Sequence, residues 1–293
     1  MTPLISLLTI LVLLLTFVMV TVVSQFLRRQ QRFRLSLRRI RAYQAMPVAI
    51  SEAVESERPI HVSLGGSGLG AESTISALAA ADLLYPLAER AAIASQMPII
   101  SLSDPTALGL AQGTLRRAYE RRRNLAAYRA TAARWYPQGP RSLAFAAGVA
   151  GAMADEDVSV SVVAGRFGPE IGFIGEMAMR YDQLFFGQSD QLDGQAVAWV
   201  MAERPLIGEE LYVAGAYLPE HPSALHLSQV LAMEGLRLLA IGGILVAALL
   251  ALAAALFEDP LSFLRTVGIF LAVIGAVLAA IFVLRYWQRR RWG

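Results

Sequence analysis

The sequence predicts an α/β domain, with a Rossmann-like and mostly parallel sheet, joined to three transmembrane helices. Three observations support this fold class. Short apolar runs alternate with longer helical segments through the middle of the chain, as strands connected by helices do. These runs are apolar almost without interruption, which is typical of parallel strands buried on both faces. Both ends of the chain carry apolar stretches of about 20 residues, the length that a helix needs to cross a bilayer.

The N-terminal stretch predicts the first span. Residues 1–27 contain no charged side chain, and the apolar run over 4–26 is long enough to cross the hydrocarbon core. A cleaved signal peptide is the alternative, but it requires basic residues before the apolar run. Here seven arginines follow the run, between Arg28 and Arg41. We therefore expect a retained helix over 1–27 and a basic juxtamembrane segment over 28–45.

Two apolar stretches near the C-terminus, 238–257 and 266–284, predict a transmembrane helical hairpin over 236–286, followed by a basic tail over 287–293. The chain contains no lysine, and clusters of arginine follow the first span and the last, whereas the loop between the second and third spans has only Arg265. Because basic residues favour the cytoplasmic side, we expect a membrane protein with three spans and its N-terminus outside. The main α/β domain, 46–228, and the C-terminus are then cytoplasmic.

Charge and composition limit the partners. The net charge of +3 and the pI near 9.4 come largely from the arginine clusters beside the predicted spans. Basic residues at that place favour anionic lipid headgroups, so we expect the segment from Arg28 to Arg41 to contact the lipid bilayer rather than nucleic acid. No ionisable side chain lies within the three apolar stretches, which argues against a transporter or a proton pump.

Cysteine and histidine usage disfavours a metal centre. The chain has no cysteine, which excludes disulfides and thiolate metal sites. Its three histidines, His61, His221 and His226, lack the spacing of a metal site.

Small residues in the second predicted span favour assembly. Gly243, Ala247, Ala251 and Ala255 recur at four-residue spacing, which allows helices to approach closely. We expect a homo-oligomer or a subunit of a membrane assembly. The alternative is that the stripe reflects only the general abundance of alanine.

Short segments between the predicted spans are assigned to strands or helices by their composition. The expected strands are 60–64, 98–102, 142–147, 158–164 and 196–201. The expected helices are 71–95 with a kink at Pro86, a helix from Asp104 through the arginine-rich 116–134, 171–186 and 206–217. The start at Asp104 combines a capping residue with proline at the first helical position, although Gly109 and Gly113 weaken the turns that follow.

A glycine-rich loop, LGGSGLG over 64–70, follows the first expected strand. From Gly66 to Ala71 it matches the G-x-G-x-x-A dinucleotide fingerprint, in which glycines let the backbone approach a phosphate and helix amides bind it. Two details disagree with that fingerprint. Its ribose-binding acid comes about 20 residues on, whereas Asp104 comes much later. Glu72 also lies in the expected first helical turn, where its charge competes for the helix dipole.

A second glycine loop follows the expected strand 158–164 and also precedes a helix. Loops after parallel strands meet at the carboxyl ends of the sheet, where ligands bind at a reversal of strand order. We therefore expect a crevice for a small anionic ligand, with Arg166 as charge partner and the amides of Gly66 to Gly68 as donors. Its expected residues are Gly65, Gly66, Ser67, Gly68, Gly70, Glu72, Asp104, Gly165, Arg166, Gly168 and Glu170, with Glu203 as a further wall. The alternative is that both loops are only tight strand-to-helix turns.

The catalytic motifs considered match this sequence less well than the dinucleotide fingerprint does. A phosphate-binding P-loop needs a lysine, and the G-x-S-x-G elbow fails because position 69 is leucine. Ser67 has no histidine at a suggestive position, and the acidic triplet Asp155 to Asp157 is best explained as a solvated turn. Two functions stay open. One is a membrane-anchored binding or assembly module, and the other is a membrane-bound enzyme acting on a nucleotide or a membrane-associated substrate.

The stretch from His61 to Tyr119, which begins HVSLGGSGLG, resembles an uncharacterised family of bacterial integral-membrane proteins classed only as a domain of unknown function. The likeness extends through the domain into the terminal hairpin. The resemblance implies a prokaryotic membrane protein, so we expect the three predicted spans to lie in the bacterial plasma (inner) membrane. It supplies no catalytic residue, cofactor or substrate.

Overall fold

Five strands form one parallel sheet with the order β3-β2-β1-β4-β5. They are β1 (Ile60–Gly65), β2 (Ile99–Leu102), β3 (Ala133–Trp135), β4 (Val160–Arg166) and β5 (Leu184–Ser189). The chain runs outward from β1 to β3 and then returns to place β4 beside β1, so the strand order reverses between β1 and β4. The computed structural model describes residues 21, 38–70, 72–219 and 223–256. The predicted α/β class with a parallel sheet is confirmed.

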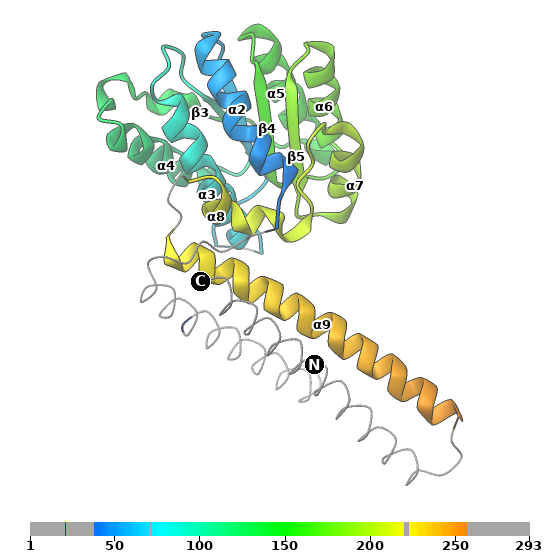
Figure 1. Cartoon of the computed structure of the whole chain (residues 1–293). Helices are drawn as coiled ribbons and strands as arrows, with labels where there is room; N and C mark the ends of the chain where they lie inside the picture. Colours follow the sequence, from blue (N-terminus) through cyan, green and yellow to red (C-terminus); the bar gives the residue numbers. More distant parts are fainter. Residues whose placement is uncertain (1–20, 22–37, 71, 220–222, 257–293) are drawn as a thin grey trace. The chain divides into compact units, whose positions relative to one another are not determined.

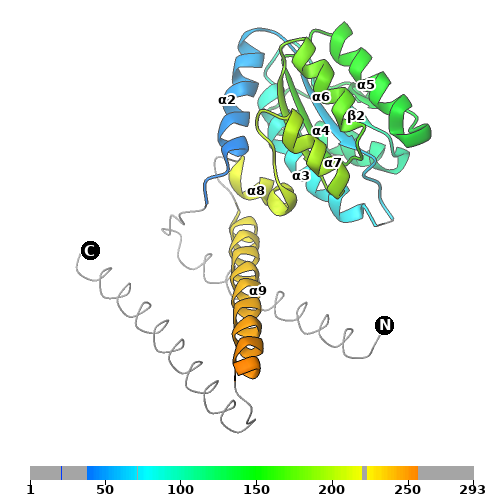
Figure 2. The ribbon, with the colours of Figure 1, turned by 90° about the vertical axis from the view of Figure 1, so that its right-hand side faces the viewer.

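Helices cover both faces of the sheet (Figures 1 and 2). One layer contains α2 (Arg41–Glu55), α3 (Thr74–Ala91) and α4 (Leu108–Arg121), and the other contains α5 (Leu143–Asp155), α6 (Ile171–Arg180) and α7 (Leu192–Met201). Short elements are η1 (Pro105–Ala107), η2 (Leu125–Ala127), η3 (Ala130–Ala132), η4 (Pro140–Ser142), η5 (Gly208–Val213) and α8 (Ala214–Tyr217). The inner strands are therefore covered on both sides.

The apolar character of the strands follows from this burial. Every residue of β1 and β2 is buried, and β4 is buried except at its last residue. Between the sheet and the second helix layer, the core is built around Phe145, Phe167 and Phe185. Strands buried on both faces have no polar side, which explains why they read as continuous apolar runs.

A polar chain crosses the sheet inside the core. His61 in β1 is buried, and its Nδ1 and Nε2 lie 2.8 Å from Ser161 Oγ and 2.8 Å from Ser101 Oγ. Ser101 Oγ donates its single proton to Ser63 Oγ, at 2.8 Å, so it accepts from His61 Nε2–H. Burial lowers the pKa of His61 to about 3, so the ring is neutral. With its proton on Nε2, Nδ1 accepts from Ser161 Oγ at 2.8 Å, a closer contact than the 3.9 Å between that hydroxyl and Met153 Sδ. The imidazole thus joins β2, β1 and β4.

The sequence assignment was wrong at two strands and two helices. Residues 142–147 and 196–201, expected as strands, lie largely in α5 and α7, because a short apolar run does not distinguish a strand from a buried helix. The expected helix 171–186 ends at Arg180 and its last residues belong to β5. The expected helix through 116–134 ends at Arg121 and gives way to 3₁₀ turns and β3. Pro86 lies within α3, which continues through it.

The helix α9 (Ala224–Leu256) has 33 residues and is thus about 50 Å long at 1.5 Å per residue. Among the described residues, its segment Leu225–Ile244 is the one helix long and apolar enough to cross a membrane by length and composition. This segment overlaps the second predicted span. By its contacts the chain divides into two units, one ending at Val230 and the other containing α9 from Leu231 onward.

The other membrane predictions fall outside the part of the chain that the structure describes. These are the first span over 4–26, apart from residue 21, the third span over 266–284, most of the basic segment 28–45 and the tail 287–293. The confirmed fold class is therefore the α/β sheet, and the count of three spans stays a prediction.

Replacing Gly113 by alanine is expected to stabilise the domain by about 0.5–1 kcal/mol, because glycine within a helix costs that much conformational entropy relative to alanine. Gly113 lies inside α4, is exposed, and has no heavy atom within 4 Å of where a Cβ would stand. Thermal unfolding of the full-length protein in detergent measures the change. An unchanged or lower melting temperature would contradict the description of this turn of α4.

Candidate functional site

A cavity of about 690 Å³ lies at the carboxyl ends of β1, β4 and β5, where the strand order reverses. Open α/β sheets bind ligands at this place. Four segments line the cavity, and each follows a strand: Gly66 after β1, residues 138–143 after β3, residues 166–173 at and after β4, and Gln191 with Asp193 after β5. The amino-terminal ends of α5, α6 and α7 all contribute to this wall.

The two glycine loops meet at this edge of the sheet, as the parallel topology predicts. Gly66 N donates to the Arg166 carbonyl at 2.8 Å, and Arg166 N donates to Ser67 Oγ at 2.8 Å. Gly65 has a φ of +59°, and a Cβ there would lie 2.5 Å from the Arg166 carbonyl oxygen. A Cβ at Gly165, whose φ is +145°, would collide with the Leu64 carbonyl. Both glycines are therefore required by the close approach of β1 and β4.

The backbone amides of the first loop are already engaged. Each donates to an acceptor of the protein itself: Gly66 to Arg166 O, Ser67 to Leu64 O, Gly68 to Ser73 Oγ, Leu69 to Thr106 Oγ1 and Gly70 to Thr74 Oγ1. Donation of the Gly66 to Gly68 amides to a ligand, as expected from the sequence, would require these hydrogen bonds to break. α3 also begins at Thr74, later than the fingerprint places its helix. The loop is a turn closed by hydroxyl groups.

Ser67 and Asp104 have structural roles. Ser67 is fully buried, and its hydroxyl accepts from Arg166 N and lies 3.4 Å from Ser76 Oγ. Asp104 caps η1 by accepting from Thr106 N at 2.8 Å and from Thr106 Oγ1 at 2.6 Å. The predicted cap at Asp104 with Pro105 behind it is confirmed. The Asp104 carboxylate also contacts Gly68, which leaves no room for a side chain at that position.

Four of the expected residues line the cavity: Gly66, Arg166, Gly168 and Glu170. The other seven do not line it: Gly65, Ser67, Gly68, Gly70, Glu72, Asp104 and Gly165. Glu203 follows the C-terminal end of α7, whereas the cavity is lined from the N-terminal end of that helix.

Two guanidinium groups supply positive charge to the cavity. Arg166 Nη2 lies 3.8 Å from Glu72 Oε2, but the Glu72 side chain is 91% exposed, so this ion pair contributes little in water. Arg141 comes from a separate segment, and within the described residues no hydrogen bond or ion pair involves its guanidinium. Arg141 and Ser142 both have left-handed backbone, with φ of +52° and +55°. Such conformations are unfavourable for non-glycine residues and concentrate at ligand sites.

Carboxylates near the cavity accept hydrogen bonds from backbone amides of the protein. Glu170 is buried, and its Oε1 accepts from Gly168 N at 2.9 Å. Asp193 Oδ1 accepts from Gly194 N at 2.8 Å. Burial raises the pKa of the Asp190 carboxyl, which follows β5, while a hydrogen bond from Ser76 and the charge of Arg166 act in the opposite direction.

Sequence reasoning missed the cavity residues that follow β3 and β5: Gln138, Arg141, Ser142, Leu143, Gln191 and Asp193. Residues of both strands were predicted to belong to helices, over 116–134 and 171–186. The loops at the carboxyl ends of β3 and β5 were therefore not placed at the site. The phenylalanines of LFFGQS, bounded by the turn residues that follow, carry the strand signal that identifies β5.

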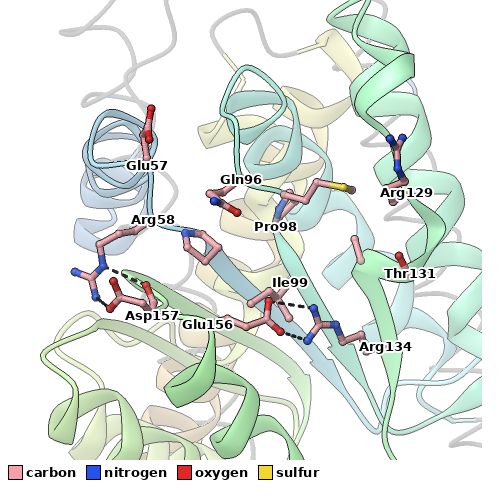
Figure 3. Close-up of a pocket in the computed structure, with 13 residues that line it drawn as sticks. Glu57, Arg58, Gln96, Pro98, Ile99, Arg129, Thr131, Arg134, Glu156 and Asp157 are labelled. Carbon is pink, nitrogen blue, oxygen red and sulfur yellow. Dashed lines mark hydrogen bonds and ion pairs between the residues drawn. The ribbon is translucent and has the colours of Figure 1, made fainter.

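A second cavity, of about 470 Å³, lies at the amino ends of β1 and β2 (Figure 3). Its charged side chains largely pair with one another. Arg58 Nη2 lies 2.8 Å from Asp157 Oδ1, and Arg134 makes two hydrogen bonds to the carboxylate of Glu156. Arg129 donates to two backbone carbonyls. At the strand-order reversal, by contrast, Arg141 has no partner among the residues that the structure describes and Arg166 is only weakly paired. The cavity there is therefore the better candidate for a charged ligand.

The strand order and the cavity at its reversal define a Rossmann-like α/β domain with a candidate site for a charged ligand. The chain belongs to a family described as a domain of unknown function (DUF6754), whose model matches residues 4–261. The predicted membership of an uncharacterised family is thereby confirmed. Searches of curated proteins and of solved structures found no match.

Proposed function

We propose that this protein is a membrane-anchored binding module whose α/β domain takes a small anionic ligand in the cavity at the carboxyl ends of β1 and β4. One observation carries the proposal: Arg141 and Arg166, from two separate segments, line one cavity at the reversal of strand order. The volume of about 690 Å³ lies within the range of small-molecule sites. A ligand anion would replace the exposed Glu72 beside Arg166.

The amino ends of three helices support the same ligand charge. The first turns of α5, α6 and α7 border the cavity, and the helix dipole gives each amino end a partial positive charge. Glu170 and Asp193 oppose this potential in part, but each already holds a backbone amide. The enzyme alternative gains no support from Ser67, whose hydroxyl is buried and engaged.

The membrane part of the proposal rests on composition. Leu225–Ile244 is long and apolar enough to span, and the sequence adds apolar stretches over 4–26 and 266–284. The arginines that follow the first and last stretches favour a cytoplasmic α/β domain and contact with anionic lipid headgroups. We also propose a homo-oligomer or a membrane assembly on the small-residue stripe that begins at Gly243.

Ligand titration of the full-length protein in phosphatidylcholine nanodiscs tests the site. Inorganic phosphate, pyrophosphate and ADP serve as anionic probes, with calorimetry as the measurement. Binding of at least one probe is expected, and Arg141→Ala and Arg166→Ala should each weaken it about 10-fold to 100-fold, because each removes a charge-assisted hydrogen bond of about 1.5–3 kcal/mol. Arg129→Ala, in the second cavity, is the control and should leave affinity unchanged. Absence of binding by every probe, or equal effects of all three variants, would refute the proposal.

A further inference from the structure

The anion cavity has an apolar wall as well as a charged one. Leu143 and Phe173 line it from the first turns of α5 and α6. Pro169 also lines it, and in the second glycine loop it lies between Arg166 and Glu170. Leu143 is 45% exposed and Phe173 is 55% exposed, although comparable side chains such as Phe145 and Phe167 are buried in the adjacent core. The wall therefore presents apolar surface that stays exposed in the described part of the chain.

A second group of exposed apolar side chains lies on α7. Gln191 and Asp193 bring the start of this helix to the cavity, and Leu192 between them is 91% exposed. Trp199 and Val200 follow seven and eight residues later, are also exposed, and share a helical face with Leu192. The first turn of α6 packs on α7, since a Cβ at Gly172 would lie 3.2 Å from Val197 Cγ1. Phe173 is thus next to the helix that carries this stripe.

A ligand that is only anionic or only apolar would leave part of the cavity wall without a matching contact. A compact anion would pair with Arg141 and Arg166 but would leave Leu143 and Phe173 in water. A purely apolar ligand would cover Phe173 and leave both guanidiniums without a counter-charge. A molecule that carries an anionic headgroup on a hydrocarbon chain satisfies both.

We propose that the ligand of this cavity is an anionic amphiphile, with a phosphate-like headgroup held by Arg141 and Arg166 and a hydrocarbon chain lying against Leu143 and Phe173 toward the stripe on α7. This inference rests on the proposed function and names the chemical class of its ligand. Burial of each methylene against the apolar wall adds affinity by the hydrophobic effect.

Two phosphate monoesters of equal charge test the inference. Methyl phosphate and hexyl phosphate are titrated against the full-length protein in phosphatidylcholine nanodiscs, with empty nanodiscs measuring partition into lipid. Hexyl phosphate should bind at least tenfold more tightly than methyl phosphate. Phe173→Ser and Leu143→Ser should reduce this preference severalfold, because each should weaken the binding of hexyl phosphate more than that of methyl phosphate. Ile75→Ser is the matched control, because Ile75 is exposed on α3 and does not line the cavity.

The outcomes separate the two proposals. If both esters bind equally, and both are weakened by Arg166→Ala, the anion site stands and the amphiphile inference is wrong. If neither ester binds, the anion site fails and the inference fails with it. If the preference for hexyl phosphate persists in Phe173→Ser and in Leu143→Ser, the chain does not lie on this wall. If the protein is a dimer that Leu192→Ser dissociates, and hexyl phosphate shows no preference, a second copy covers the apolar surface and the inference is likewise overturned.

Discussion

Gly65→Ala is expected to destabilise the α/β domain by about 2–5 kcal/mol, the sum of a left-handed backbone penalty and overpacking. Gly65 ends β1 with a φ of +59°. An added Cβ would lie 2.5 Å from the Arg166 carbonyl oxygen and 2.6 Å from Phe167 Cζ. The carbonyl belongs to the neighbouring strand and accepts from Gly66 N, so it cannot withdraw without breaking that hydrogen bond.

Chemical unfolding of the full-length protein in detergent, followed by tryptophan fluorescence, measures this loss. Gly66→Ala is the matched control one residue later. Its Cβ would lie 3.5 Å from the nearest atoms, which is ordinary van der Waals contact, so we expect a change within about 1 kcal/mol. Equal effects of the two substitutions would show that the close approach of β1 and β4 is described incorrectly.

The second large effect is a loss of stability in acid caused by His61. Burial of the ring, together with the charge of Arg134, lowers the pKa of His61 from 6.5 to about 3 in the folded protein. The fold therefore binds the neutral imidazole in preference to the charged one. The resulting stability is fully present above pH 6.5 and is lost as the pH falls toward 3, by about 1.4 kcal/mol for each pH unit.

A pH series of unfolding free energies for the natural protein and His61→Asn isolates this group from the carboxyls that titrate in the same window. Asparagine retains a donor and an acceptor toward Ser101 and Ser161 but takes up no proton. Between pH 6 and pH 4.5 the unfolding free energy of the natural protein should fall more steeply than that of the variant. The two slopes should differ by about 1.4 kcal/mol per pH unit, the value for uptake of one proton on unfolding. Parallel slopes would show that His61 is not held neutral between these two serines.

A strand or helix is predicted correctly from the sequence where its hydrophobicity differs clearly from that of the segments on either side. β1, β2 and β4 are short apolar runs bounded by glycine, proline or charged residues, and all three are predicted correctly. β5 follows α6 after a short turn and was absorbed into that helix. α5 is alanine-rich and apolar on most of its surface, so its beginning resembled a buried strand.

These errors determined which site residues were found. The residues after β4, Arg166 and Glu170, were placed at the correct edge of the sheet because parallel strands bring their carboxyl ends together. Arg141 was missed because the turn after β3 was not recognised. The hydrogen bonds that the backbone amides of the first glycine loop donate within the protein were not predictable either. It depends on hydroxyl groups of Ser73, Thr74 and Thr106, and the last of these is more than 30 residues away in the chain.

Direct location of a bound anion is the measurement that tests the central claim most closely. Crystals of the full-length protein grown in lipid and soaked with tungstate, an electron-dense analogue of phosphate, would reveal the anion by anomalous scattering. Our account predicts a peak in the cavity at the carboxyl ends of β1 and β4, within hydrogen-bond distance of the guanidiniums of Arg141 and Arg166. An empty cavity in crystals that bind tungstate at other arginines would contradict it, and the two glycine loops would then be strand-to-helix turns only.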